Sequence, residues 1–252
     1  MPRARTPSPR QSALRREPRH PDHRLSAVTE NYLLSLYILK EEGARTTAAR
    51  IADYLTRLPE SERLGTSMAS VAGMVRRMVR EGLVRVTSEK EVALTEHGAR
   101  LAEEMMRRHR LAERMVVDLL GVDLHCAHVE AHRLEHGISN ELLALVEARL
   151  GNPTTCPFGG PIPGSGHSQH PGGTITLEQA SPNARYIVRR VPEESQELLR
   201  FLVEHQVVPE NEVVVREAAP YRGVLTIEVG GQPVAIGYEV ASRIRVSPVE
   251  AT

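Results

Sequence analysis

Apolar residues in the N-terminal part of the chain recur at helical spacing in three stretches and then alternate with polar residues. Residues 27–42, 46–55 and 67–82 carry apolar side chains three and four positions apart, which predicts three amphipathic helices. Residues 83–87 and 92–95 alternate around a polar turn, which predicts a short β-hairpin. Three helices followed by a hairpin is the order of a winged helix-turn-helix, in which the third helix enters the major groove of DNA.

Helical spacing continues through the middle of the chain and then gives way to short strands. The pattern predicts a long helix at 95–121, a helix that Asp123 caps, and another at 139–150 that Ser139 caps. Residues 152–173 are dense in Pro and Gly, and we interpret them as a linker. The candidate strands beyond it are residues 174–177, 184–189, 212–216, 224–229, 233–237 and 242–246, with one helix at 195–204.

These strands predict a small, partly closed barrel of five or six strands, in which Gly230 and Gly231 form a hairpin turn. The fold class we expect is therefore mainly α with a small β domain. The middle helices carry more apolar surface than one winged domain needs. This excess predicts a self-association surface, and a twofold dimer would suit a protein that reads two DNA half-sites.

Composition limits the class of protein further. The 252 residues balance 32 basic against 32 acidic side chains, but residues 1–24 carry seven Arg against Glu17 and Asp22. We expect this segment to be a disordered basic arm, either a solvated extension or a contact for DNA phosphates. Two cysteines, Cys126 and Cys156, are too few for a disulfide framework. No apolar run approaches the ~20 residues of a membrane span, so we expect a soluble, cytoplasmic protein.

A stripe of metal-binding side chains marks one helix. On a helix, His128, His132, Glu135 and His136 fall within about 100° of arc. Such a set suits a divalent cation better than an apolar core, because buried polar groups need partners. His109 and Glu113 lie one turn apart on the preceding helix and could supply further ligands.

The third helix carries the candidate DNA contacts. Ser67 and Ser70 lie at its start, where small polar side chains reach base edges, and Arg77 lies on its exposed side, where it could meet a phosphate. We therefore predict that Ser67, Ser70 and Arg77 contact double-stranded DNA.

Four blocks of sequence occur in a specific order: Val28-Thr-Glu-Asn-Tyr-Leu-Leu, Arg107-Arg-His-Arg-Leu-Ala-Glu-Arg, His128-x-x-x-His-Arg-Leu-Glu-His and Asn152-Pro-x-x-Cys-Pro-Phe-Gly-x-Pro-Ile-Pro-Gly. Together they resemble the diphtheria toxin repressor family of iron- or manganese-dependent transcriptional repressors. The resemblance implies a winged helix, a helical metal-binding and dimerisation domain, and a C-terminal SH3-like domain of the FeoA type. The implied bounds are 1–24 for the arm, 25–97 for the winged helix, 98–151 for the metal-binding and dimerisation domain, 152–173 for the linker, and 174–248 for the SH3-like domain.

The resemblance also implies two metal sites. The primary site would use Asn31, His132, Glu135 and His136. The ancillary site would use His109, Glu113 and His128, together with two ligands from the SH3-like domain that fall, by a looser alignment, on Glu194 and Glu197.

The primary site departs from both known types of the family. Iron-type members carry Met and Cys at the positions of Asn31 and His132, and manganese-type members carry Asp and Glu. A set of Asn, His, Glu and His has no sulfur, and its nitrogen and oxygen donors suit Mn(II) or Fe(II), with a preference for manganese. Zn(II), Co(II) and Ni(II) should substitute in vitro. The loop at 56–64 is also longer than is usual between the two DNA-reading helices.

The function we expect is a homodimeric, metal-dependent repressor that senses Mn(II) or Fe(II), binds operator DNA and controls metal-uptake genes. We expect neither an enzyme nor a protein with a small organic substrate. One alternative is a winged-helix regulator that responds to an organic ligand. The other is a zinc hydrolase, but that motif needs Glu directly after its first His. Val129 follows His128 here, and Arg133 follows His132.

Overall fold

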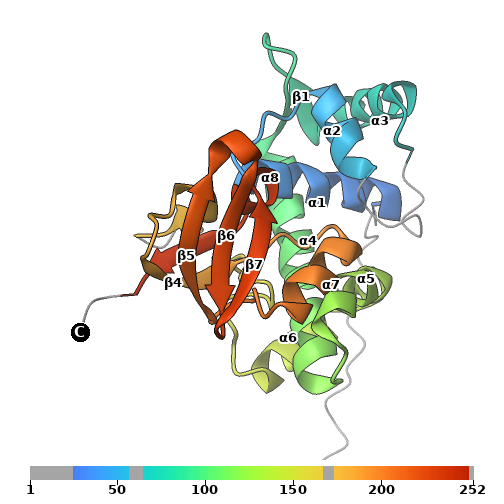
Figure 1. Cartoon of the computed structure of the whole chain (residues 1–252). Helices are drawn as coiled ribbons and strands as arrows, with labels where there is room; N and C mark the ends of the chain where they lie inside the picture. Colours follow the sequence, from blue (N-terminus) through green and yellow to red (C-terminus); the bar gives the residue numbers. More distant parts are fainter. Residues whose placement is uncertain (1–24, 57–64, 167–172, 250–252) are drawn as a thin grey trace, which may run out of the picture.

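The computed structural model describes residues 25–56, 65–166 and 173–249. The basic arm at 1–24 and the loop at 57–64 lie outside the described residues, and so do the predictions made for them. Figure 1 shows the N-terminal helices at one end of the molecule, the middle helices at the other, and the sheet packed beside both.

The N-terminal unit is a winged helix-turn-helix, as predicted. Its helices share one apolar core, in which Leu33, Ile51 and Met78 are fully buried. The wing is an antiparallel hairpin that pairs Val84 with Leu94. The elements are α1 (Ala27–Glu41), α2 (Ala48–Leu55), α3 (Met68–Arg80), β1 (Val84–Val86) and β2 (Val92–Leu94).

Helix ends in this unit follow from local chemistry. The Ser26 hydroxyl accepts the backbone N–H of Thr29 and so caps α1, which stops where Gly43 takes a left-handed φ of 68°. Gly98, near the start of the next helix, is required by packing. A Cβ there would lie 1.9 Å from the carbonyl oxygen of Leu83, so only glycine lets this helix approach the wing closely.

The middle unit consists of helices that carry the histidine stripe. Its elements are α4 (Glu96–Arg114), α5 (Leu124–Glu135) and α6 (Asn140–Arg149). The long helix predicted at 95–121 is α-helical only as far as Arg114 and continues as a π-helical turn over Met115–Leu119. Ser139 caps α6 as predicted, whereas Asp123 stands at the start of α5 without a side-chain capping bond.

The C-terminal unit is a six-stranded antiparallel sheet in the order β3-β8-β4-β5-β6-β7. Gly230 and Gly231 form the predicted β6–β7 turn, with φ of 56° and 81°. The strand predicted at 242–246 is displaced, because a short helix ends at Ala241 and the strand starts at Arg245. The elements are β3 (Ile175–Thr176), β4 (Arg185–Arg190), α7 (Gln196–Glu204), β5 (Glu212–Ala219), β6 (Val224–Val229), β7 (Gln232–Gly237), α8 (Tyr238–Ala241) and β8 (Arg245–Pro248).

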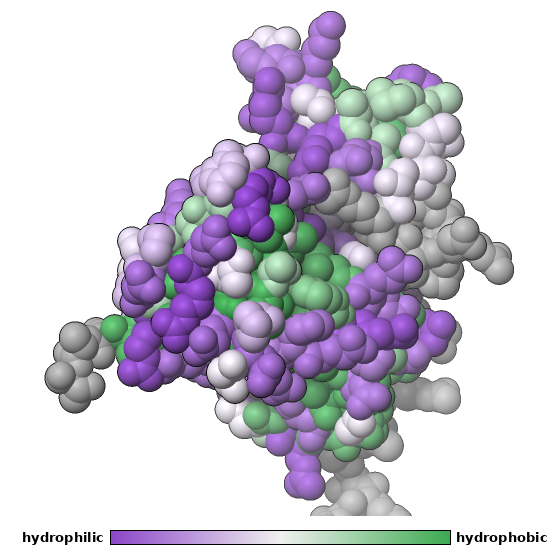
Figure 2. All heavy atoms as spheres, viewed as in Figure 1, coloured by the Kyte–Doolittle hydropathy of each residue, from purple (hydrophilic) through white to green (hydrophobic). Residues whose placement is uncertain are grey.

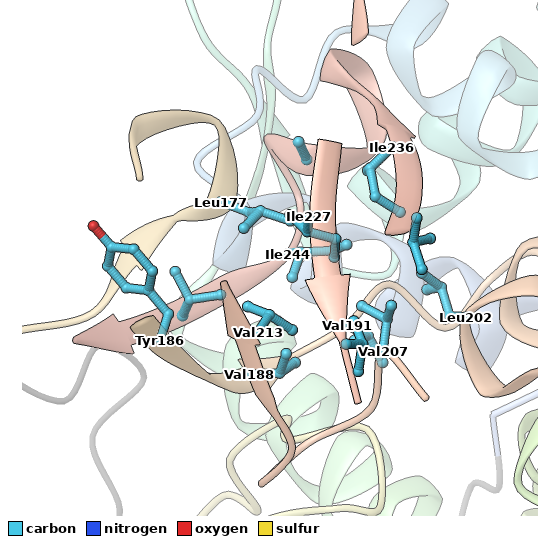
Figure 3. Close-up of a cluster of buried hydrophobic side chains, with 14 of the residues drawn as sticks. Leu177, Tyr186, Val188, Val191, Leu202, Val207, Val213, Ile227, Ile236 and Ile244 are labelled. Carbon is cyan, nitrogen blue, oxygen red and sulfur yellow. The ribbon is translucent and has the colours of Figure 1, made fainter. Parts of the chain in front are cut away.

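The core of this unit reaches into the middle helices. Figure 3 shows Val188, Val213 and Ile227 from the sheet facing one another. The same apolar cluster includes Phe158 and Cys156 from the Pro/Gly-rich segment, both buried. The segment interpreted as a linker therefore packs against the sheet domain in its described part, and it helps to fix that domain on the helices.

Candidate metal centre

Three histidines and two carboxylates meet where α4 packs against α5. His109 and Glu113 lie one turn apart on α4, and His128, His132 and Glu135 lie on one side of α5. The three imidazole rings are mutual neighbours, with centroids 4.5–4.9 Å apart. The sequence pattern predicted that each set occupies one face of its helix, and the resemblance implied that His109, Glu113 and His128 share a site.

His109 lies between the two predicted sites and contacts both. Its Nδ1 lies 2.6 Å from Glu135 Oε2, and its Nε2 lies 2.9 Å from Glu113 Oε1. Both carboxylates only accept, so in the metal-free protein each ring nitrogen of His109 can donate a hydrogen to one of them. The ring thus bridges the two sites, and as an ancillary ligand it would give up the hydrogen on Nε2.

The ancillary cluster contains His109, Glu113, His128 and Glu193. One donor atom from each of these buried residues lies within 4.8 Å of every other. His128 Nδ1 lies 3.1 Å from Glu113 Oε1 and 3.2 Å from His109 Nε2. Glu193 comes from the sheet domain, in the segment just before α7, so the cluster joins two units of the molecule.

The primary cluster gathers around one oxygen of Glu135. Glu135 Oε1 lies 3.0 Å from His132 Nδ1 and 3.5 Å from His136 Nε2. The other nitrogen of His136, Nδ1, lies 2.6 Å from Oε2 of Glu30 on α1. Asn31, the next residue of α1, is buried. The first helix of the DNA-binding unit therefore reaches this cluster directly.

Electrostatics divides the histidines into two kinds. Burial opposes a charge on His109, but the carboxylates of Glu113 and Glu135 outweigh it and raise the pKa of His109 well above its ordinary value. Burial lowers the pKa of His132 to about 4, although Glu135 acts in the opposite direction. At neutral pH, His132 is therefore neutral and offers a lone pair. Burial and the nearby Glu113 also raise the pKa of Glu193.

Buried donor atoms that have no hydrogen-bond partner also indicate a metal site. Among the described residues, six buried side-chain nitrogen or oxygen atoms have no hydrogen-bond partner, and four belong to predicted or clustered ligands. A buried polar atom without a partner costs about 1–3 kcal/mol, so such a concentration needs an explanation. The four atoms are Asn31 Oδ1, Glu113 Oε2, His128 Nε2 and Glu193 Oε1.

The structure does not bring Glu194 or Glu197 into the ancillary cluster. Glu194 is buried, but its carboxylate lies 2.5 Å from Arg243 Nη2, and that guanidinium also contacts Glu42. Glu197 is exposed on α7. Glu194 precedes α7, which begins at Gln196, so Glu194 and Glu197 do not share a helix face as the i and i+3 spacing predicted.

The candidate DNA-contact residues lie at the start of α3 and along it: Ser67 is its N-cap, and Ser70 and Arg77 belong to the helix. The Ser67 hydroxyl accepts the backbone N–H of Ser70 and caps the helix, and both residues are exposed. The Arg77 guanidinium donates to Glu81 Oε1 at 2.8 Å, with about half of its side chain exposed. These side chains are at the surface, where each forms local hydrogen bonds.

Exposed leucines gather on the middle helices. Leu145 is 69% exposed and Leu120 is 64% exposed. Figure 2 shows apolar surface at the lower end of the molecule, around the position of α5 and α6. The remaining exposed leucines of these helices are Leu119, Leu134 and Leu142.

Comparison with known proteins decides the family. A family model described as the iron dependent repressor metal binding and dimerisation domain matches residues 95–164, and the FeoA domain model matches residues 175–248. The iron-dependent repressor IdeR of Mycobacterium tuberculosis H37Rv is 38% identical over 234 residues, which cover 88% of this chain and 97% of IdeR. The chain belongs to the iron-dependent repressor family.

Further comparisons support the same family assignment. The diphtheria toxin repressor of Corynebacterium diphtheriae is 42% identical over 137 residues, covering 54% of this chain and 57% of that repressor. The manganese regulator SloR superposes with a TM-score of 0.74 at 27% identity, covering 89% of this chain and all of SloR. A manganese-dependent transcriptional repressor in complex with manganese gives a TM-score of 0.76 at 26% identity, covering 88% of this chain and all of that one.

These findings confirm the predicted family and fold class. The C-terminal sheet is a FeoA domain. The iron-dependent repressor family consists of transcriptional repressors, so the zinc hydrolase alternative is excluded. Among residues 25–56, 65–166 and 173–249, no helix combines the length and apolar content needed to cross a bilayer.

Sequence reasoning missed two carboxylates. Glu193 was passed over in favour of its neighbour Glu194, and only the direction of each side chain distinguishes them. Glu30 was not predicted, because the resemblance implied only its neighbour Asn31 as a ligand from the first helix. In the sequence, Glu30 is a carboxylate in the first turn of a helix. Solvated helix starts commonly carry such a residue, so the pattern did not mark Glu30 as functional.

Proposed function

We propose that this protein is a homodimeric repressor that binds operator DNA when it holds Mn(II) or Fe(II), and that it controls metal-uptake genes. The observation that carries the proposal is the concentration of buried, unpartnered donor atoms on Asn31, Glu113, His128 and Glu193. IdeR is an iron-dependent repressor by name, and SloR is a manganese regulator. Other divalent ions should substitute in vitro, as Zn2+ does in the structure of ScaR.

Two sites are proposed. The primary site uses Asn31, His132, Glu135 and His136. The ancillary site uses His109, Glu113 and His128, with Glu193 in place of Glu194 and Glu197. All these donors are nitrogen or oxygen, which suits Mn(II) or Fe(II). The domain bounds proposed with these sites are residues 25–97 for DNA binding, 98–151 for metal binding and dimerisation, and 174–248 for the FeoA domain.

The primary site explains how metal could control DNA binding. A bound divalent ion supplies the positive charge that draws carboxylate, amide and imidazole donors together. Asn31 belongs to α1, whereas His132 and Glu135 belong to α5. Donors on both helices therefore fix the winged unit relative to the middle helices. The metal favours this arrangement only to the extent that it binds this arrangement more tightly than the others. A coupling of about 1–3 kcal/mol between metal and DNA binding would raise DNA affinity about 5- to 150-fold.

In this proposal α3 reads the DNA, and two copies of the chain bind it as a dimer. Ser67 and Ser70 are proposed to reach base edges and Arg77 a phosphate, because they are exposed at the start and on the outer side of α3. The exposed leucines of the middle helices are proposed to form the twofold interface, which would place two α3 helices against two half-sites.

Fluorescence anisotropy with labelled DNA tests the proposal. Duplexes enriched from a random-sequence library by the Mn(II)-loaded protein serve as probes. Affinity is then measured after chelation and after adding back Mn(II), Fe(II) under anaerobic conditions, or Zn(II). We expect tight binding only with metal. Equal affinity in every condition would contradict metal control and favour a regulator that responds to an organic ligand.

A further inference from the structure

We propose that Glu30 is a positioning residue that turns His136 toward the primary metal site and so ties a metal ligand to the DNA-binding unit. This inference rests on the proposed function. It concerns a carboxylate that belongs to neither donor set, since its partner is a ligand and not the ion.

The hydrogen bond fixes which nitrogen of His136 faces the site. Glu30 Oε2 lies 2.6 Å from His136 Nδ1, and an ionised carboxylate can only accept. Nδ1 must therefore carry the hydrogen when the ring is a neutral ligand, which leaves the lone pair on Nε2. That nitrogen lies 3.5 Å from Glu135 Oε1, on the side where the other primary donors gather.

The position of His136 explains why such a hydrogen bond would matter. His136 is the C-cap of α5, at the end of the regular helix, and its side chain is more exposed than those of His132 and Glu135. A ring at a helix end has fewer neighbours to hold its orientation. Histidines that bind metal commonly donate their second N–H to a carboxylate, which fixes the tautomer and makes the ligand more basic.

The chain positions of the pair connect the two units. Glu30 and His136 are 106 residues apart and lie on α1 and at the end of α5. Asn31, the neighbour of Glu30, is a proposed ligand from the same turn of α1. The first helix would then hold the primary site in two ways: through the Asn31 amide at the ion and through the Glu30 carboxylate behind His136.

Mn(II) binding by variants of the full chain provides the first test, with free Mn(II) read by electron paramagnetic resonance. We expect Glu30→Ala to weaken binding of one ion about 10- to 100-fold, the usual effect of losing such a partner. Glu30→Gln should lose less, because its amide oxygen still accepts from Nδ1. Glu96→Ala removes a first-turn carboxylate of α4 and is the matched control, with no expected change.

The tautomer of His136 provides the second test. In Zn(II)-loaded protein with 15N-labelled histidine, nitrogen chemical shifts identify the protonated and the metal-bound nitrogen. We expect hydrogen on Nδ1 and metal on Nε2 in the parent protein. Metal on Nδ1 would overturn the inference, because Glu30 would then have no hydrogen to accept.

The outcomes separate this inference from the proposed function. If the parent protein binds no Mn(II), the proposed function fails and this inference with it. If the parent protein binds Mn(II) and Glu30→Ala binds it equally tightly, only the role of Glu30 is refuted. If Glu30→Ala fails to fold by circular dichroism, Glu30→Gln and the Zn(II)-loaded parent protein decide the question.

Discussion

Glu41, the last residue of α1, pairs with Arg110 of α4 at 2.6 Å, and both side chains are almost completely buried. Arg190 of β4 lies 2.9 Å from the same carboxylate. Arg110 also donates to the carbonyl oxygen of Pro161. One carboxylate thus joins the DNA-binding unit, the middle helices and the FeoA domain. Its ion pairs are among the contacts that connect the three units, together with the pairs of Arg243 with Glu42 and Glu194.

Removing the charge of Glu41 should destabilise the protein strongly. Glu41→Gln leaves the buried guanidinium of Arg110 without its anion, and breaking a buried ion pair typically costs about 3–5 kcal/mol. Glu210→Gln, which breaks an exposed pair with Arg189, should cost about 0–1 kcal/mol. Chemical denaturation of the metal-free protein at neutral pH compares the two. Equal losses would mean that the Glu41 pair contributes no more than a surface pair.

The same pair should make stability depend on pH in a defined direction. Burial opposes ionisation of Glu41, but Arg110 and Arg190 outweigh it and hold the pKa of this carboxyl below its ordinary value. A lowered pKa gives stabilisation that is present above the unfolded-state pKa and is lost as pH falls through the folded-state pKa. The stability difference between the parent protein and Glu41→Gln should therefore shrink below about pH 4. A difference that stays constant down to pH 2 would contradict this assignment.

Glu193→Gln should destabilise the protein only when metal is bound. In the metal-free protein, Glu193 is buried near Glu113 and has an oxygen without a partner, so the neutral amide should be tolerated or stabilising. With saturating Mn(II), the variant should melt lower than the parent protein and bind one ion roughly tenfold or more weakly. Glu197→Gln, on the exposed face of α7, is the control and should match the parent protein. Differential scanning fluorimetry and metal titration measure both effects.

Arg77→Ala should weaken binding to DNA of any sequence. If Arg77 meets a phosphate, its loss lowers the slope of log affinity against log salt by about 1. Arg100→Ala is the matched control, because Arg100 also forms an exposed i,i+4 pair, on α4 with Glu96. Anisotropy over a range of salt concentrations measures the slope. An unchanged slope together with altered sequence preference would indicate a base contact instead.

Leu145→Glu should dissociate the proposed dimer. Leu145 is 69% exposed on α6, and a carboxylate placed in an apolar interface must be desolvated without a partner. Tyr221→Glu changes a residue that is 85% exposed on the FeoA domain and should leave the dimer intact. Sedimentation velocity distinguishes the two. A Leu145→Glu protein that stays dimeric at micromolar concentration would move the interface elsewhere.

Helix periodicity predicted most of the candidate centre. His109 and Glu113 repeat after four residues, and the stripe on α5 follows the same period, so the residues on each face were determined before any packing was known. The resemblance to the diphtheria toxin repressor family implied that the two faces meet, because it grouped His109 and Glu113 with His128. The bridging position of His109 could not be predicted, because it depends on how α4 and α5 are aligned along their axes.

The carboxylates outside the helices were harder to predict. Glu193 and Glu194 lie in an irregular segment between β4 and Ser195, the residue that caps α7. Neighbouring residues in such a segment face different directions, and no period shows which one points inward. The partner of Glu194 is Arg243, 49 residues away, which only the folded sheet brings near. The burial of Arg110 could not be predicted either, because its partner Glu41 is 69 residues away in the sequence and only the fold brings the two together.

The ancillary cluster takes its donors from α4, α5 and the FeoA domain, so an unfolded chain cannot hold them together. An ion bound there would stabilise the native protein by mass action, by about 2.7 kcal/mol at a concentration 100 times its Kd. In a cell short of metal, a larger fraction of the protein would be unfolded and open to proteases. The abundance of the repressor, and not only its occupancy, would then follow the supply of metal.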